Sequence, residues 1–426
     1  MHNATTVVSI PAPAGSTRSY GMTAMPILPE PPPLPTTVLL VVGVLTFNFS
    51  GRAGRRAWIR RLSPISANAR TFFVLPQDQP DLDSGSEDVI HFDIPRTDRS
   101  VLGKYLLQNR WFAFASLLPD HVKWVARMDD DAAVNAAAMA GRLLLAPHQE
   151  LTVYGPHRNW YMWHSESMQA VCWEYTPVRW WYAQLEKQKH VSSPPSPPSA
   201  PADERTGKPR QPRRARFDNE NECTRKGVDG PFPFAAGPFM AYSRGVVKFL
   251  LPMFLADEAY VVGPRRQSRL VNARTGYVAA PTHKSHPSKR IFMEEVYYAY
   301  MLFRELHNAS RAMVLIHEPM HEIYSRTKIY PDEPIGGFGS TKMSHEIFHK
   351  LRYASHFETL FNSSYLTDRV RRENNDPLPR LSCERLGTRW YPALQSFMSA
   401  RYGLSSWQRC EFDSVRWPMV KLRSAG

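Results

Sequence analysis

Short apolar runs alternate with segments whose apolar residues recur at helical spacing along the first half of the chain. The runs that predict strands, because they are short and rich in β-branched or aromatic residues, are residues 37–47, 71–76, 87–94 and 122–128. A basic helix is predicted after the first run, and further helices at residues 100–118 and 132–146. This alternation predicts an α/β fold with a mostly parallel, twisted sheet flanked by helices.

The second half of the chain carries two longer patterns. Residues 230–254 read as an apolar turn rich in Gly and Pro, followed by a helix, and residues 291–306 have the spacing of a long amphipathic helix. The tail from about residue 340 is expected to add helices. We therefore expect a helical C-terminal extension at residues 361–426, packed on the main domain.

Three segments are too rich in Pro, Ser and basic residues to form a core, which predicts disorder. They are a lead at residues 1–35 and insertions at residues 187–216 and 264–290. The main domain is therefore expected to cover residues 36–360.

The net charge of +14 narrows the classes of partner. A basic chain suits phosphates, nucleic acid or an anionic surface. The basic residues concentrate in the predicted insertions, and no nucleic-acid-binding module is recognisable, so we expect no nucleic-acid partner. Residues 37–47 are too short to cross a bilayer, which takes about 20 apolar residues, so no membrane anchor is visible in the sequence.

Three consecutive carboxylates, Asp129, Asp130 and Asp131, directly follow the predicted strand at residues 122–128. Each like-charge pair costs roughly 4 kcal/mol at about 4 Å and an effective dielectric constant of about 20. Along a strand, Asp129 and Asp131 would face one side and Asp130 the other. Two carboxylates at the carboxyl end of a parallel strand suit Mn²⁺ or Mg²⁺ together with phosphate oxygens. The alternative is an exposed acidic turn.

Six short motifs in one order resemble the inverting β-1,3-glycosyltransferases of the GT-A fold, which include β-1,3-galactosyltransferases and N-acetylglucosaminyltransferases. The motifs are "RRAWIR" (55–60), "TDRSVLGKYLLQNRW" (97–111), "ARMDDDAAVN" (126–135), "FPFAAGPFMAYS" (232–243), "EEVYYA" (294–299) and "FHKLRYASHF" (348–357). The long insertions resemble those of divergent protozoan members that decorate surface glycoconjugates. The resemblance implies a GT-A domain with a UDP-sugar donor and a glycan acceptor.

By this resemblance, the acidic triplet binds the donor. Asp129, Asp130 and Asp131 match the residues that hold the nucleotide sugar, while Lys104 and Arg56 match positions on the donor side. The alternative for both cations is a plain surface position.

The resemblance also implies a metal cofactor, Mn²⁺ or Mg²⁺. Asp131 is the expected direct ligand, with Asp129, and His349 matches the late metal-binding histidine. Other histidines could take this role: His345, close to His349 in the sequence, and His317 and His321, further back.

Catalysis is assigned by resemblance to "EEVYYA". Glu295 stands at the position of the catalytic base, and Glu294 is expected to be its structural partner on the acceptor side. Gly237 lies in a turn that shapes the acceptor pocket, and Trp160 is expected to stack on a sugar ring, although a buried Trp is the more common explanation for such a residue.

The chain departs from the family in three respects. Glu295 replaces an Asp, Ala299 replaces a Gly, and the usual N-terminal membrane anchor is not visible. The resemblance implies a hexosyltransferase that moves galactose or N-acetylglucosamine from UDP to a glycan in β-1,3 linkage, within the Golgi lumen and associated with membranes. The alternative is an inactive sugar-nucleotide or glycan-binding protein on the same fold.

The four cysteines are expected to form two disulfides in an oxidising lumen. Cys172 and Cys223 flank the first insertion, and Cys383 and Cys410 share the C-terminal tail. These positions predict the pairs Cys172–Cys223 and Cys383–Cys410.

Overall fold

The computed structural model describes the chain in segments that together form one α/β core. The described residues are 26–46, 52–62, 67–77, 86–94, 101–134, 136–148, 151–155, 159–164, 169–171, 228–235, 238–262, 277–278, 290–291, 294–317, 323–325, 347–349, 381–385 and 408–412.

A nine-stranded sheet forms the centre of the molecule. Its strands are β1 (Leu40–Leu45), β2 (Ala69–Pro76), β3 (Val89–Phe92), β4 (Trp124–Asp129), β6 (Thr152–Gly155), β10 (Phe239–Ser243), β13 (Val314–His317), β16 (Leu381–Arg385) and β17 (Gln408–Phe412). They are arranged in the order β16-β17-β13-β6-β10-β4-β1-β2-β3. β10 is antiparallel to both of its neighbours and β16 is antiparallel to β17, while the other neighbouring pairs are parallel.

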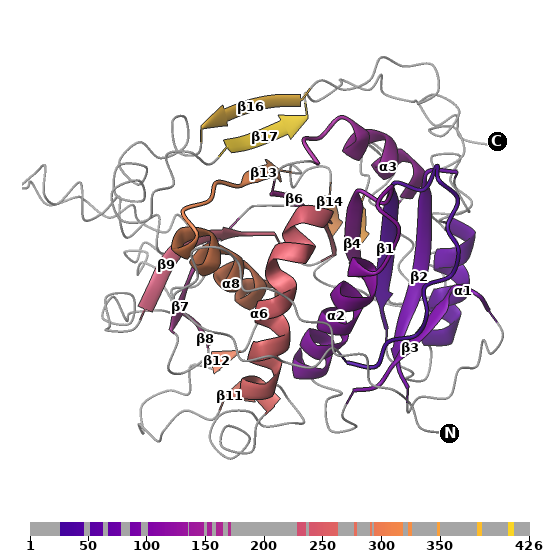
Figure 1. The fold of residues 1–426 in the computed structure, drawn as a ribbon, viewed down its shortest axis with the longest axis horizontal. Coiled ribbons are helices and arrows are strands. Elements are labelled where there is room, and N and C mark those ends of the chain that lie inside the picture. The colour runs from indigo at the N-terminus through magenta and orange to yellow at the C-terminus, as the bar shows by residue number, and fades with distance from the viewer. Residues whose placement is uncertain are drawn as a thin grey trace, which may run out of the picture.

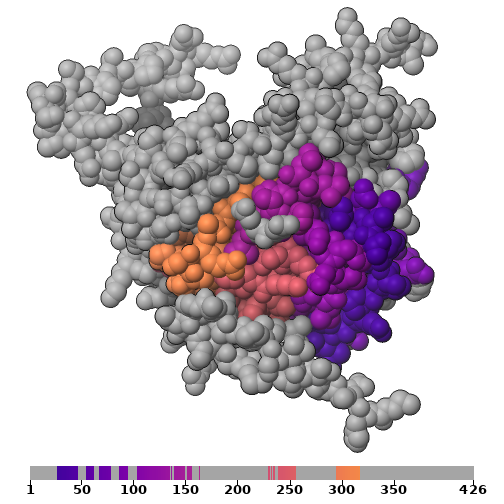
Figure 2. Space-filling model, turned by 45° about the horizontal axis from the view of Figure 1, so that its top comes forward, coloured from indigo at the N-terminus to yellow at the C-terminus, as the bar shows by residue number. Residues whose placement is uncertain are grey.

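Helices cover both faces of this sheet (Figure 1). The helices are α1 (Arg52–Leu62), α2 (Val101–Ser116), α3 (Ala136–Leu144), α6 (Arg244–Val262) and α8 (Glu294–Asn308). α2, α6 and α8 pack on one face, and α1 and α3 pack on the other. The described surfaces of α2, α6 and α8 adjoin one another in Figure 2. The predicted α/β fold with a mostly parallel sheet is therefore confirmed.

The apolar run of β1 is explained by this double covering. All six of its residues are buried. Val41 and Leu45 contribute to the core under α2, α6 and α8, whereas Val42 and Val44 contribute to the core under α1 and α3. A strand between two helical layers has no solvent face, so its sequence is apolar throughout instead of alternating.

Three smaller sheets lie beside the main one. Their strands are β5 (Ala132–Val134), β7 (Asn159–His164), β8 (Gln169–Val171), β9 (Val228–Phe234), β11 (Tyr277–Val278), β12 (Arg290–Ile291), β14 (Ile323–Ser325) and β15 (Ile347–His349). β14, β15 and β5 form one sheet, β8, β7 and β9 a second, and β11 pairs with β12. In the β14–β15–β5 sheet, β5 begins directly after the acidic triplet.

The strand order reverses between β1 and β4. The chain runs outward from β1 to β2 and β3, and then returns through α2 to β4 on the opposite side of β1. Ligands of open α/β sheets bind outside the carboxyl ends of the strands at such a reversal. The register pairs Leu45, the last residue of β1, with Asp129, the last residue of β4. The acidic triplet therefore lies at the position where this fold class forms its ligand crevice.

Several elements differ from the prediction because strands pair with segments elsewhere in the chain. The helix predicted at residues 132–146 begins only at Ala136, because Ala132–Val134 form β5 and pair with β15. The apolar turn predicted near residue 230 consists of β9 and β10. Tyr277–Val278, inside the predicted second insertion, pair with Arg290–Ile291.

The two ends of the chain also differ from the prediction. Within residues 361–426, the part that the structure describes consists of two strands instead of helices, because β17 adds to the edge of the main sheet beside β13. Residues 26–35, predicted to belong to a disordered lead, precede β1, and Leu28 and Leu34 among them pack against the core. None of the helices in the described segments is long and apolar enough to cross a membrane.

Gly43→Ala is expected to destabilise the protein by about 1–3 kcal/mol, the usual effect of overpacking a core. A Cβ at Gly43 would lie 2.5 Å from Cε2 of Trp111. The Trp111 indole is fully buried and its Nε1 donates a hydrogen bond to the Ala126 carbonyl oxygen at 2.9 Å, so it has little freedom to withdraw. Urea unfolding measures the change.

Gly54→Ala is the matched control for that substitution. A Cβ at Gly54, in α1, meets no atom within 4 Å. Ala has the higher helix propensity, so this change should stabilise the protein by about 0.5–1 kcal/mol. Equal unfolding midpoints for Gly43→Ala and the parent would contradict the packing described for Trp111.

The register of β16 and β17 bears on the Cys383–Cys410 prediction. It places Cys383 directly opposite Cys410 in the antiparallel pair. Opposite Cα atoms in such a pair lie about 4.5–5.5 Å apart, within the range that disulfides span. Mass mapping of the non-reduced protein secreted from a eukaryotic host should recover one peptide that contains both residues. Recovery of both thiols unoxidised would contradict the pair. Cys172 and Cys223 lie outside the described residues.

Candidate active site

A cluster of charged side chains gathers at the carboxyl end of β4. Lys104, from α2, places Nζ 2.6 Å from Oδ1 of Asp129 and 3.1 Å from Oε1 of Glu294. Arg127, two residues before Asp129 in β4, places Nη1 3.3 Å from the same Asp129 oxygen and 3.7 Å from Glu294. A strand end and two helices therefore combine into one charged site.

The first turn of α8 contributes the carboxylates of Glu294 and Glu295. Negative charge at a helix N-terminus interacts favourably with the helix dipole, so the sequence "EEVYYA" suits a helix start. Arg127 Nη2 donates a hydrogen bond to Glu295 Oε1 at 3.1 Å. Arg127 therefore links the predicted base to the predicted donor-binding acid, and its contact with Glu295 spans 168 positions of sequence.

The carboxylates of Asp129, Glu294 and Glu295 lie close to the two cations, Lys104 and Arg127. Together with burial, these neighbours shift the pKa of Glu295. Burial, and next the charge of Glu294, raise the pKa of Glu295 to about 7, although Arg127 and Lys104 act to lower it. For Lys104, burial lowers the pKa, but Asp129 and Glu294 raise it and the net value lies above the usual one. Both cations are therefore charged at neutral pH, and Glu295 exchanges its proton near neutrality.

Asp130 faces the other side of the sheet. Thr46, which follows β1, donates a hydrogen bond from Oγ1 to Asp130 Oδ2 at 2.9 Å, and Nη1 of Arg55 in α1 lies 3.4 Å from Asp130 Oδ1. The predicted alternation thus holds for Asp129 and Asp130. β4 ends at Asp129, so Asp130 and Asp131 lie in the turn that follows the strand.

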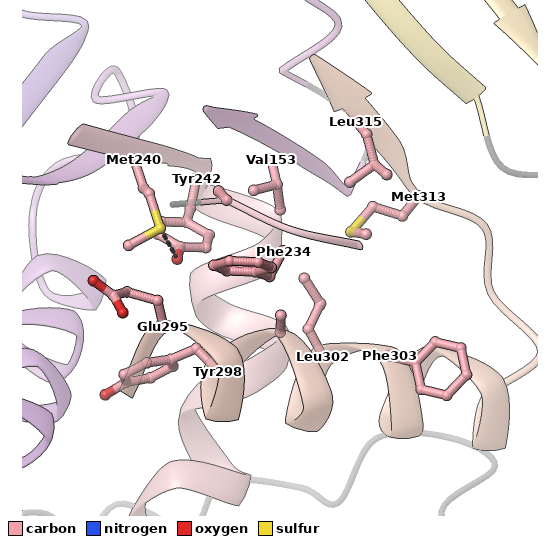
Figure 3. Close-up of a pocket in the computed structure, with 12 residues that line it drawn as sticks. Val153, Phe234, Met240, Tyr242, Glu295, Tyr298, Leu302, Phe303, Met313 and Leu315 are labelled. Carbon is pink, nitrogen blue, oxygen red and sulfur yellow. Dashed lines mark hydrogen bonds between the residues drawn. The ribbon is translucent and has the colours of Figure 1, made fainter. Parts of the chain in front are cut away.

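A small cavity lies beside Glu295, between α8 and strands β6, β10 and β13 (Figure 3). The cavity has a volume of about 20 Å³ accessible to water, which is room for about one water molecule. Its lining is apolar apart from Glu295 and the hydroxyls of Tyr242 and Tyr298. Figure 3 shows Glu295 and Tyr298 at one end, and Met313 and Leu315 at the other. Glu295 therefore borders apolar side chains on the side away from Arg127, which adds to its burial.

Three other predicted site residues are Arg56, Trp160 and Gly237. Arg56 is fully buried in α1, next to Arg55, which reaches Asp130. The backbone of Trp160 pairs with Pro233 in the β7–β9 sheet, but its side chain lies outside the described part. Gly237 also lies outside it.

The backbone of His349 comes close to the triplet. In the antiparallel pair of β15 and β5, His349 is the register partner of Ala132, the residue after Asp131. Its side chain, like those of His317, His321 and His345, is outside the described residues. The pairing brings together two predicted metal ligands that lie far apart in the sequence.

The donor set offers a partial fit to Mn²⁺ or Mg²⁺. Asp129 is engaged by Lys104 and Arg127, and both oxygens of Asp130 have protein partners. Within the described segments, no group of three His, Cys, Asp or Glu side chains is placed to hold a metal. A carboxylate and an imidazole suit Mn²⁺. Asp131 and His349 are the residues that would hold such an ion, together with Asp129 if its carboxylate were released from Lys104.

Arg127 is the site residue that the sequence reasoning missed. A cation two residues before an acid on the same strand shares its side of the sheet. An Arg inside the otherwise apolar run "WVARM" was the available signal, because a buried guanidinium requires carboxylate partners.

Comparison with known proteins gives little direct guidance. No protein-family model matches the sequence, and no curated protein matches it. Among solved structures, the chain is similar to mouse xyloside xylosyltransferase 1 in its apo crystal form. That similarity covers 73% of this chain and 96% of the mouse chain, at 12% sequence identity and a TM-score of 0.32. A likeness this weak identifies no activity, so the function has to follow from the site.

Proposed function

We propose that this protein is a metal-dependent inverting glycosyltransferase of the GT-A type that transfers galactose or N-acetylglucosamine from a UDP-sugar to a glycan in β-1,3 linkage. One observation carries the proposal. Asp129 of the acidic triplet meets Lys104 and the Glu294–Glu295 pair at the strand-order reversal between β1 and β4, and these residues belong to three of the six family-like motifs.

The geometry suits a single displacement at the anomeric carbon. The acceptor hydroxyl gives its proton to Glu295 while its oxygen bonds to that carbon, and the bond from the carbon to UDP breaks, so that UDP leaves with the electron pair. A base is most effective when its pKa lies near the working pH, and the pKa of Glu295 is raised to about 7. Lys104 brings positive charge to the donor side, beside Asp129. A bound Mn²⁺ would supply further charge stabilisation to the diphosphate.

The alternative function, a sugar-nucleotide or glycan-binding protein without catalysis, has one observation in its favour. Asp129 and Asp130 are already balanced by Lys104, Arg127 and Arg55. The triplet therefore does not require a metal to offset the repulsion between its charges. Binding of UDP without any effect of Mn²⁺ would favour this alternative.

Golgi localisation and membrane association belong to the same proposal, since both come from the family resemblance. The facing positions of Cys383 and Cys410 in β16 and β17 would allow a disulfide in such an oxidising compartment.

Release of UDP from a panel of UDP-sugars tests the proposed function. We expect release from UDP-galactose or UDP-N-acetylglucosamine in the presence of Mn²⁺, an increase on adding β-linked glycan acceptors, and loss of release in EDTA. UDP-glucose and UDP-xylose serve as donor controls. UDP binding without release from any donor would exclude the transferase and leave the binding protein.

A further inference from the structure

Arg127 connects the two halves of the candidate active site through one guanidinium group. Nη2 donates to Glu295 Oε1 at 3.1 Å, while Nη1 lies 3.3 Å from Asp129 Oδ1. One planar group therefore sets the distance between the proposed base and the first acid of the triplet.

The surroundings of Arg127 make this connection rigid. Its side chain is 0% exposed, and it extends from β4, which is held by β1 on one side and β10 on the other. The guanidinium is a planar fork with fixed donor directions, whereas an ammonium is a point charge on a flexible stem. Lys104 is 23% exposed and contacts Asp129 and Glu294, while Arg127 also reaches Glu295.

We propose that Arg127 is a positioning residue that holds the base Glu295 in a fixed relation to the donor-binding Asp129. This inference rests on the proposed transferase function. It assigns Arg127 a task that Lys104 does not share. Lys104 sustains donor binding, and Arg127 aligns the base with the bound donor, so the two residues should affect different kinetic constants.

The electrostatics of Glu295 agree with this assignment. Burial and the neighbouring Glu294 raise its pKa, and Arg127 is the strongest of the groups that lower it. Loss of the guanidinium would remove both an orienting hydrogen bond and the main cation near the carboxylate.

A double-mutant cycle tests the inference, with the parent, Arg127→Lys, Glu295→Gln and the double variant. Lys keeps the positive charge, which protects folding, but it cannot hold two carboxylates on separate nitrogens. Arg127→Lys should lower kcat by roughly 10–100-fold, while the affinity for UDP with Mn²⁺, measured calorimetrically, stays within about 3-fold of the parent. In the Glu295→Gln background, the same change should lower kcat by less than about 3-fold, because residues that act as a unit are not additive.

Arg244→Lys is the matched control. Arg244 lies outside the cluster and bonds the backbone carbonyls of Ser116, Leu118 and Pro119 at the end of α2. It should lower the urea midpoint and leave kcat unchanged. Equal losses of kcat for Arg127→Lys in both backgrounds, or a loss confined to UDP affinity, would overturn the positioning role.

The cycle is also measured by urea unfolding, which does not depend on activity. Arg127→Lys should destabilise the protein less in the Glu295→Gln background than in the parent, since the bridged partner is already altered. If the parent transfers sugar from no donor, the proposed function fails. The unfolding cycle still decides whether Arg127 and Glu295 are coupled, and additive effects would show that they are not.

Discussion

Glu295→Gln is expected to lower turnover by about 10²–10⁴-fold, the usual contribution of a general base. Gln keeps the size of the side chain and an oxygen that accepts the hydrogen bond from Arg127, but it cannot take the acceptor proton. UDP affinity should change little, because Lys104 and Asp129 remain paired. Steady-state kinetics and calorimetry separate the two effects. Full turnover in this variant would move the base to another residue, with Glu294 the first candidate.

Glu295→Asp is the matched variant that keeps the charge and restores the residue of the resembled family. The shorter side chain withdraws its carboxylate from Arg127, and a displacement of about 1 Å costs roughly 10²-fold in rate. We therefore expect an activity between those of the parent and Glu295→Gln. Activity equal to that of the parent would show that the contact with Arg127 is dispensable.

The pH dependence of activity and that of stability should run in opposite directions. Activity should rise with pH through about 7, where Glu295 loses its proton. The folded protein holds this proton more tightly than the unfolded chain, whose pKa is near 4.5. The contribution of Glu295 to the free energy of unfolding is therefore present below about pH 4.5 and is lost as pH rises to about 7. Glu295→Gln should accordingly stabilise the protein at pH 8 relative to the parent, and less so at pH 5, as thermal unfolding would show.

Asp131→Ala is expected to abolish the enhancement of UDP-sugar binding by Mn²⁺ while leaving the fold intact. Asp131 lies in the turn between β4 and β5, and the backbone of the other proposed ligand, His349, pairs with the next residue, Ala132. Loss of a direct ligand should cost at least about 10-fold in metal affinity.

Asp120→Ala is its matched control. Asp120 lies in the turn between α2 and β4 with a side chain that is 91% exposed, and its removal should leave binding unchanged. Titration with UDP-sugar, with and without Mn²⁺, compares the two variants. An Asp131→Ala protein that binds as well as the parent in both conditions would contradict the metal assignment.

The hydrophobic pattern alone predicted the strands and helices that need no distant partner to be recognised. β1 is uniformly apolar, β4 is apolar apart from Arg127 and its last residue, Asp129, and α8 is long, so the period of each can be read locally. The order of strand and helix then placed Asp129 at a carboxyl strand end, where ligands of this fold class bind. The chemistry of the triplet and the family-like motifs added the candidate roles of Lys104 and Glu295.

The tertiary structure decided the features that depend on residues far apart in sequence. Ala132–Val134 form a strand because β15 lies beside them, and the described C-terminal segments are strands because β13 offers an open sheet edge. Arg127 meets Glu295 across 168 positions, so no local pattern could reveal their contact. The raised pKa of Glu295 depends first on burial, which only the folded structure provides, and next on the adjacent Glu294, while Arg127 and Lys104 from other elements lower it. The sequence thus determined which residues could react, whereas folding determined their charge states and alignment, because electrostatic energy depends on distance and burial in space.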